Sequence, residues 1–279
     1  MMRHCLLTGL LCIGCAAVRA QGLGLDHWEK GRHDWRYRGD QFGVALGRSP
    51  IRGGLADTQV ALGGIRLDSR LGGPRPTGPS WDLSLAAGAI DRNPEGTTGD
   101  LSYGALASQG EFSVRPSQKW LLHSDVQSAP GLLASTVGTQ VDSGDFGTLG
   151  LGVGHGRQGA MSGWAYQTRY SVRIWKGVDV SWQSDRQLAG YSDLASYQRG
   201  GGQQDMTRRQ VTAGLTLSDR SSVSGSYETV RQAGGGIHRR FGITRQVWYS
   251  PNVKLGFKAE REIRSGDYDV GLSLSIPIK

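Results

Sequence analysis

Apolar and polar residues alternate along most of this chain. In the last stretch, YDVGLSLSIPIK, every second residue from Tyr268 to Ile278 is apolar, and the residues between them are polar or small. Successive side chains of a strand point to opposite faces, so this alternation predicts a β-strand with one apolar face. The stretch is about twice as long as most half-buried strands of soluble proteins. Its length therefore favours a strand that crosses a membrane, with lipid on the apolar side.

The same alternation recurs upstream, with apolar residues on one parity and polar residues on the other. It predicts about fourteen strands, an even number that places the C-terminus at the end with the tight turns. The strands are expected to begin near Gln41, Leu55, Ser80, Leu101, Lys119, Leu133, Gly147, Met161, Val178, Met206, Ser221, Ile237, Val253 and Asp267.

The connections between these segments also alternate, between short and long. Tight links are expected at 115–118, 143–146, 175–177, 218–220 and 250–252, and longer, Gly-rich links at 91–100, 190–205 and 232–236. Short periplasmic turns and longer outward loops are typical of outer-membrane barrels. We therefore predict an all-β fold, a transmembrane antiparallel β-barrel over residues 41–279. A large soluble β-sandwich or a secreted repeat protein is the alternative.

Composition agrees with a β-rich membrane protein. Gly occurs 44 times and hydrophobic residues make up only 37% of the chain, which disfavours helices and excludes a bundle of apolar membrane helices. The formal net charge is +8, but Lys and Arg are scattered through alternating segments of an exported chain. We therefore expect no nucleic-acid partner. The basic groups are expected to line a wet lumen or to contact acidic lipopolysaccharide and outer-membrane lipid.

The first twenty residues read as a signal peptide. Arg3 precedes a short apolar run from Cys5 to Val18, and small residues permit cleavage near Ala20. A lipoprotein signal cleaved before Cys15 is the alternative. All three cysteines lie in this segment, so the mature chain, with residues 21–40 preceding the barrel, is expected to contain no disulfide. We expect it in the outer membrane of a Gram-negative cell.

The inward face of the predicted barrel carries charges of both signs. Either a selective pore or a closed, ion-paired lumen would give this pattern. The candidate pore-lining residues are Arg169, Arg173, Asp179, Glu228, Lys254, Lys258 and Glu260.

Enzyme chemistry is not expected. His123 and Asp125 share a face, but Ser124 lies on the opposite one, which is incompatible with a hydrolase triad. His155 and His238 are isolated lumen or rim histidines without metal-ligand spacing. The glycines of GLGVGHG, Gly150–Gly156, are followed by neither a helix nor a phosphate-binding Lys. We therefore expect no cofactor and no metal.

Several stretches resemble the barrel of fimbrial outer-membrane ushers, the translocons of chaperone–usher pili. They lie in the same order as in ushers and are spread over most of the mature chain. GYSDLAS, residues 190–196, is the most specific of them. The others are residues 46–73, 103–132 and 143–154 and the terminal VGLSLSIPIK, residues 270–279.

The resemblance implies an outer-membrane barrel for fimbrial biogenesis or export, with periplasmic chaperone–pilin complexes as possible partners. Ushers also have periplasmic domains, a plug and about two dozen strands. Here Pro74–Pro79 leads straight into another strand, so we expect a short usher-like protein, with oligomers possible. The alternatives are a small porin, a polysaccharide-export barrel and a truncated usher with a structural role.

Overall fold

The structure is a computed structural model that describes residues 28–30, 34–39, 42–55, 59–71, 79–92, 102–200, 205–218, 220–234, 236–250 and 253–275. The predicted signal peptide and its cleavage site lie outside these residues. Among the described residues, no helix is long and apolar enough to cross a membrane.

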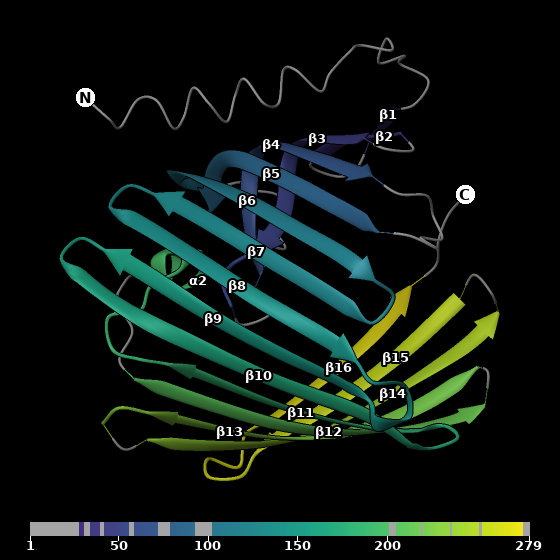
Figure 1. Ribbon diagram of the computed structural model, residues 1–279. Coiled ribbons are helices and arrows are strands. Elements are labelled where there is room, and N and C mark those ends of the chain that lie inside the picture. Colours follow the sequence, from purple (N-terminus) through teal and green to yellow (C-terminus); the bar gives the residue numbers. More distant parts are fainter. Residues whose placement is uncertain are drawn as a thin grey trace, which may run out of the picture.

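Sixteen strands form one sheet in which neighbours along the chain are neighbours in space. Each strand is antiparallel to the next. The sheet curls so that β3–β5 and β11–β13 lie on opposite sides of an enclosed space (Figure 1). The strands are β1 (Trp28–Lys30), β2 (Asp34–Arg38), β3 (Phe42–Arg52), β4 (Gln59–Leu71), β5 (Ser80–Asp91), β6 (Tyr103–Ser117), β7 (Trp120–Ala129), β8 (Leu132–Asp142), β9 (Thr148–Gln158), β10 (Met161–Trp175), β11 (Val178–Gln187), β12 (Met206–Ser218), β13 (Ser221–Gln232), β14 (Ile237–Ser250), β15 (Val253–Glu262) and β16 (Tyr268–Ser275).

The predicted all-β barrel fold is confirmed, and the fourteen predicted strands correspond in order to β3–β16. The count is corrected to sixteen by two short strands within residues 21–40. Trp28 pairs with Tyr37 across β1 and β2, and β2 pairs in turn with β3. These strands span only 28–30 and 34–38, so neither is long enough to show the sustained alternation on which the strand assignment rested.

The two faces of the curled sheet differ as the alternation predicts. Large apolar side chains are exposed on the outer face, including Leu151, Phe257 and Leu272 at 48%, 42% and 74% exposure. The alternate positions, such as Gly152, Lys258 and Gly271, face inward. A sheet with an apolar outer face and a polar lumen is the arrangement of a transmembrane barrel.

The aromatic residues on the outer face are only partly concentrated at the strand ends. Trp120, Trp164 and Trp175 lie at or near the ends of their strands. Trp182 and Tyr227, in contrast, lie four and five residues from the nearest end of their strands. Aromatic girdles of transmembrane barrels lie at the ends of the membrane strands, so the outer face has only an incomplete girdle on this side of the barrel.

The connections largely follow the predicted alternation. Even-numbered strands from β6 to β14 end in the predicted tight turns, and we call this the tight-turn end. Odd-numbered strands end at the opposite, long-loop end, although the links at 130–131 and 159–160 there are also tight. Glycines with positive φ occupy both of these turns, Gly131 at 76° and Gly159 at 60°, a backbone region that favours Gly.

The longest connection departs from expectation. Residues 190–205 were predicted to form an outward loop, but their first part folds into the barrel. Tyr191 and Leu194 are 0% exposed, and the short helix α2 (Leu194–Gln198) lies on the concave side of the sheet (Figure 1). The lumen is therefore partly filled by the chain's own loop.

Candidate functional site: a constricted, charge-lined lumen

Two segments enter the lumen from the long-loop end, and we call them together the inner constriction. One consists of the end of β3 and the residues that follow it, 51–55, and the other is the loop of residues 188–200. The backbone N–H of Ala195 donates to the carbonyl oxygen of Gly53 at 2.9 Å. This bond joins segments that are more than 130 residues apart in the chain.

The sequence of the loop specifies its local structure. Asp193 is the N-cap of α2 and its carboxylate accepts from the N–H of Ser196 at 2.8 Å, while the Ser196 hydroxyl accepts from the N–H of Asp193 at 2.8 Å. This reciprocal capping box satisfies two backbone donors at the start of a helix. Burial raises the pKa of the Asp193 carboxyl, and the hydrogen bonds from Ser196 oppose that rise.

An apolar core holds the constriction against the wall. Ile51 and Leu194, both from the constriction, are 4% and 0% exposed. They pack with Val60, Leu62, Ala86, Ile90, Ala107 and Leu132 on the inner side of β4–β8. Burial of apolar surface contributes about 25 cal/mol per Å², so this cluster favours the inserted position of the loop.

Three inward glutamines bind the backbone of the constriction. The side-chain amides of Gln109 and Gln127 donate to the carbonyl of Arg52 at 2.9 and 3.1 Å, and Gln167 donates to that of Leu55 at 3.0 Å. The side-chain amide of each of these glutamines also donates to a carboxylate on the wall, which fixes its orientation. Gln127 and Gln109 donate to Asp125, and Gln167 donates to Asp185 at 3.0 Å.

Inward glycines make room for the loop. A Cβ on Gly156 would lie 2.0 Å from the carbonyl oxygen of Ser192, and one on Gly163 would lie 2.3 Å from the backbone nitrogen of Tyr191. Both distances are too short for any real contact. Gly152, Gly154 and Gly156 therefore allow close approach between β9 and the constriction.

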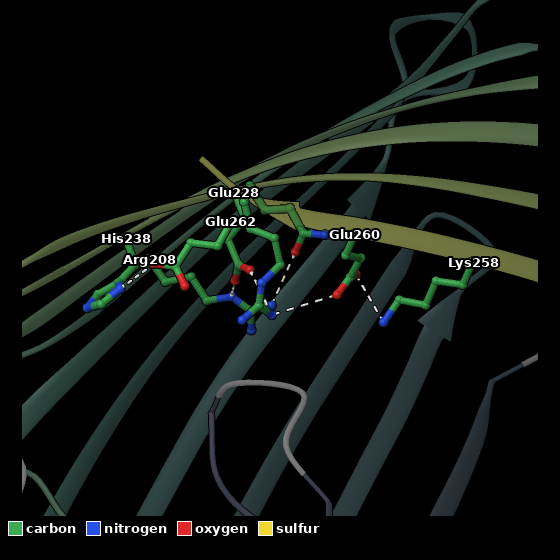
Figure 2. Close-up of polar contacts among 8 residues, drawn as sticks. Arg208, Glu228, His238, Lys258, Glu260 and Glu262 are labelled. Atoms are coloured by element: carbon green, nitrogen blue, oxygen red, sulfur yellow. Dashed lines mark hydrogen bonds and ion pairs between the residues drawn. The ribbon is translucent and has the colours of Figure 1, made fainter. Parts of the chain in front are cut away.

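The other half of the lumen is uncovered. From Met206 to Leu272, Gly242 is the only described residue that is buried. On these strands the inward charges form a ladder (Figure 2). Arg208 on β12 pairs with Glu228 on β13, Arg240 on β14 lies 4.0 Å from Glu228 and 3.8 Å from Glu260, and Lys258 pairs with Glu260 at 3.0 Å.

The ladder includes three of the candidate pore-lining residues, Glu228, Lys258 and Glu260. Arg173 and Asp179 pair with each other at 3.1 Å at the tight-turn end, far along the strands from the ladder. Arg169 faces inward on β10, while the side chain of Lys254 lies outside the described residues. That these residues line a conducting pore stays a prediction.

Sequence reasoning missed Arg208 and Arg240 as members of the ladder. Cross-strand register decides these pairings: Arg240 lies opposite Glu228 on β13 and Gly242 opposite Glu260 on β15. Alternation predicts which face of the sheet a residue lies on, but not which residues lie beside it on the neighbouring strands. The sequence could therefore show that Arg208 and Arg240 face inward, but not that they pair with Glu228 and Glu260.

The remaining candidates show no arrangement for catalysis. His123 and Asp125 face inward and Ser124 faces outward, as predicted. His238 binds Glu262 at 2.7 Å on the inner face, and His155 stacks edge-on against Trp164 on the outer face with ring centroids 4.8 Å apart. Among the described residues, no group of three His, Cys, Asp or Glu side chains could hold a metal ion.

A cavity of about 560 Å³ adjoins the constriction toward the tight-turn end. Its lining comes from β2–β6 and combines apolar groups with charges of both signs, including Arg36, Arg66, Asp68, Asp82 and Glu111. Arg66 and Asp68 pair at 2.9 Å. The lumen on this side is therefore a charge-lined vestibule beneath the constriction.

No family model matches the sequence, and no curated protein sequence is significantly similar to it. Similar solved structures are outer-membrane barrels. OccK11 (OpdR) of Pseudomonas aeruginosa is 13% identical, with a TM-score of 0.58, over 87% of this chain and 79% of that chain. Wzi of Escherichia coli is a carbohydrate-binding β-barrel involved in capsule assembly. It is 10% identical, with a TM-score of 0.61, over 88% of this chain and 70% of that chain.

The translocation pore of the P pilus usher PapC matches to a similar degree. It is 14% identical, with a TM-score of 0.56, over 88% of this chain and 68% of that chain. The usher therefore does not stand apart from the other two barrels. At these identities the comparisons establish the fold alone, that of an outer-membrane β-barrel.

Proposed function

We propose that this protein is an outer-membrane channel that passes small polar or charged solutes along the uncovered, charge-lined half of its lumen. The observation that carries this proposal is the asymmetry of the lumen. The inner constriction covers the wall of β4–β10, whereas the inward residues of β12–β16 beside it are partly or fully exposed, with Gly242 the one buried exception among the described residues. Water and small solutes have a polar path along the ladder of Arg208, Glu228 and Glu260.

The size of the barrel supports small solutes. Barrel diameter grows with strand number, and sixteen to eighteen strands leave an aqueous channel. The inner constriction occupies part of that space, so a folded protein domain does not fit beside it. Selection among solutes then depends on the width of the gap and on the charges that line it.

Planar-bilayer recording tests the proposal. The native protein is compared with a variant in which residues 190–204 are replaced by a short Gly–Ser linker that still joins β11 to β12. We expect a small conductance from the native protein and a severalfold larger one from the variant. If both folded proteins are electrically silent, the channel is ruled out and a structural role, such as that of a truncated usher, is favoured.

A role in fimbrial biogenesis is the second candidate. It is supported by the usher-like motifs and by the similarity to PapC. The most usher-like segment, residues 190–196, is the part that fills the lumen. Export of a pilin would require this loop to leave or the chain to act in an oligomer. Binding of purified chaperone–pilin complexes to the reconstituted barrel would support this role, and its absence would favour the channel or a polysaccharide-export barrel.

A further inference from the structure

On the side of the barrel formed by β9–β15, the described charged residues of the outer face are all positive. Along the described parts of β9–β15, every Asp and Glu faces inward. Arginines, by contrast, occur on both faces. Six outward arginines lie within three residues of the long-loop end of their strands: Arg157, Arg186, Arg209, Arg231, Arg239 and Arg261. We call this group the arginine belt.

The middle of the belt is a regular lattice on four adjacent strands. Cross-strand pairing aligns Arg186, Thr207 and Arg231 in one row, and Ser184, Arg209, Thr229 and Arg239 in the next. Guanidinium groups therefore alternate with hydroxyls in both rows. Strands are about 4.8 Å apart, which separates the arginine backbones in a row by roughly 10 Å.

These arginines are available to a ligand. All four are exposed, and among the described residues none of them pairs with a carboxylate. Asp205, just before β12, is engaged by the backbone N–H of Ala189. Of the flanking members, Arg261 lies over the ring of Tyr268 at 5.0 Å, and Arg157 donates to the carbonyl of Gly159.

The rows next to the belt are apolar. Toward the middle of the barrel, the same strands place Trp182, Val211, Tyr227 and Phe241 in one aligned row. Their side chains are 39%, 43%, 41% and 46% exposed. This explains why Trp182 and Tyr227 lie away from the strand ends: they border a basic rim on the outer face. Arg245, another outward arginine, lies five residues from the tight-turn end of β14 and is separate from the belt.

We infer that the belt binds a phosphorylated glycolipid of the outer leaflet, with its phosphates on Arg186, Arg209, Arg231 and Arg239 and its acyl chains along the apolar row. The inference rests on insertion in the outer membrane, as the proposed function requires. Arginine binds phosphate through two parallel N–H groups, and hydroxyls add further donors. A lattice without carboxylates, directly above an apolar row, fits a headgroup with several phosphates such as that of lipopolysaccharide.

The test compares two variants with the same loss of charge. The belt variant carries Arg186→Gln, Arg209→Gln, Arg231→Gln and Arg239→Gln. The control carries Arg115→Gln, Lys119→Gln, Lys176→Gln and Arg220→Gln, four exposed positions at the tight-turn end. Each folded protein, in detergent micelles, is titrated with purified lipopolysaccharide, with dephosphorylated lipopolysaccharide and with phosphatidylglycerol, and bound lipid is measured by native mass spectrometry.

We expect the native protein and the control to bind lipopolysaccharide equally and the belt variant to bind at least about tenfold more weakly, because each Arg near an anionic lipid surface contributes to binding. Dephosphorylated lipopolysaccharide should bind all three proteins weakly. Equal binding by the belt variant would overturn the inference, as would equal binding of phosphatidylglycerol. Bilayer conductance of the same variants reports on the channel separately, so either idea can fail alone.

Discussion

Gln127 on the barrel wall accepts a hydrogen bond from the backbone N–H of Leu194 at 2.9 Å, which connects β7 to the first residue of α2. Both residues are fully buried. The same side chain donates to the carbonyl of Arg52 in the other segment of the constriction. One glutamine therefore connects the wall to both segments that narrow the lumen.

Replacing Gln127 should loosen the constriction. Gln127→Leu removes the hydrogen bonds to both segments and leaves the buried N–H of Leu194 without its partner, which costs about 1–3 kcal/mol. We expect larger and noisier single-channel currents and a lower melting temperature. Gln140→Leu is the control, because Gln140 also faces inward but is exposed and away from the constriction. Equal effects of the two changes would contradict the anchoring role of Gln127.

Adding a methyl group at Gly156 should displace the loop. The Cβ of Gly156→Ala would lie 2.0 Å from the carbonyl oxygen of Ser192, whereas Gly271→Ala, also inward, meets nothing within 4 Å. Overpacking of this kind costs about 1–3 kcal/mol. We expect trypsin to cleave after Arg199 severalfold faster in the first variant than in the native protein. Cleavage at the native rate would show that the wall and loop adapt without opening.

The strands, their order and their faces could be predicted from the sequence because the period of two is strong over long segments. The inner constriction could not, since residues 190–196 show no period and their position depends on partners distant in the chain. Nothing in the sequence around Gln127 or Gly53 indicates that these residues bind α2. The alternate glycines at 152, 154 and 156 do signal a smooth inner surface, and could have indicated that something packs against it.

The two faces of β12 can be tested with neighbouring residues. Val211 is 43% exposed on the outer face, and Thr212 faces inward. An arginine on the lipid side costs about 2–4 kcal/mol near the midplane, so Val211→Arg should reduce the heat-modifiable, folded fraction far more than Thr212→Arg. Equal folding yields of the two variants would show that the outer face does not contact lipid.

Acid should strengthen the constriction. Burial raises the pKa of Asp193, so the closed loop binds a proton more tightly than the released loop. Protonation of Asp193 therefore stabilises the closed state. This contribution is fully present below the ordinary aspartate pKa of about 4, and it is lost as the pH rises through the raised pKa. Asn also caps helices, so Asp193→Asn should keep α2.

The measurement is the melting temperature of both proteins between about pH 4 and 8. The advantage of Asp193→Asn over the native protein should be greatest at neutral pH and should shrink as the pH falls. A constant difference across this range would contradict titration of Asp193 in the closed loop.

The charge ladder should influence which ions pass. Arg208, Arg240 and Lys258 are three positive groups and Glu228 and Glu260 are two negative ones, so removing one charge changes the balance of the ladder. Fixed charge in a narrow, low-dielectric channel raises the local concentration of counter-ions. Glu228→Gln should therefore increase anion preference, and Arg240→Gln should shift it toward cations. Reversal potentials under a salt gradient measure both changes, with Gln140→Leu as a control that alters no charge. If the two charge variants shift the reversal potential in the same direction, or not at all, the ions do not pass along the ladder, and the conducting path must be sought on the side of the charge-lined vestibule.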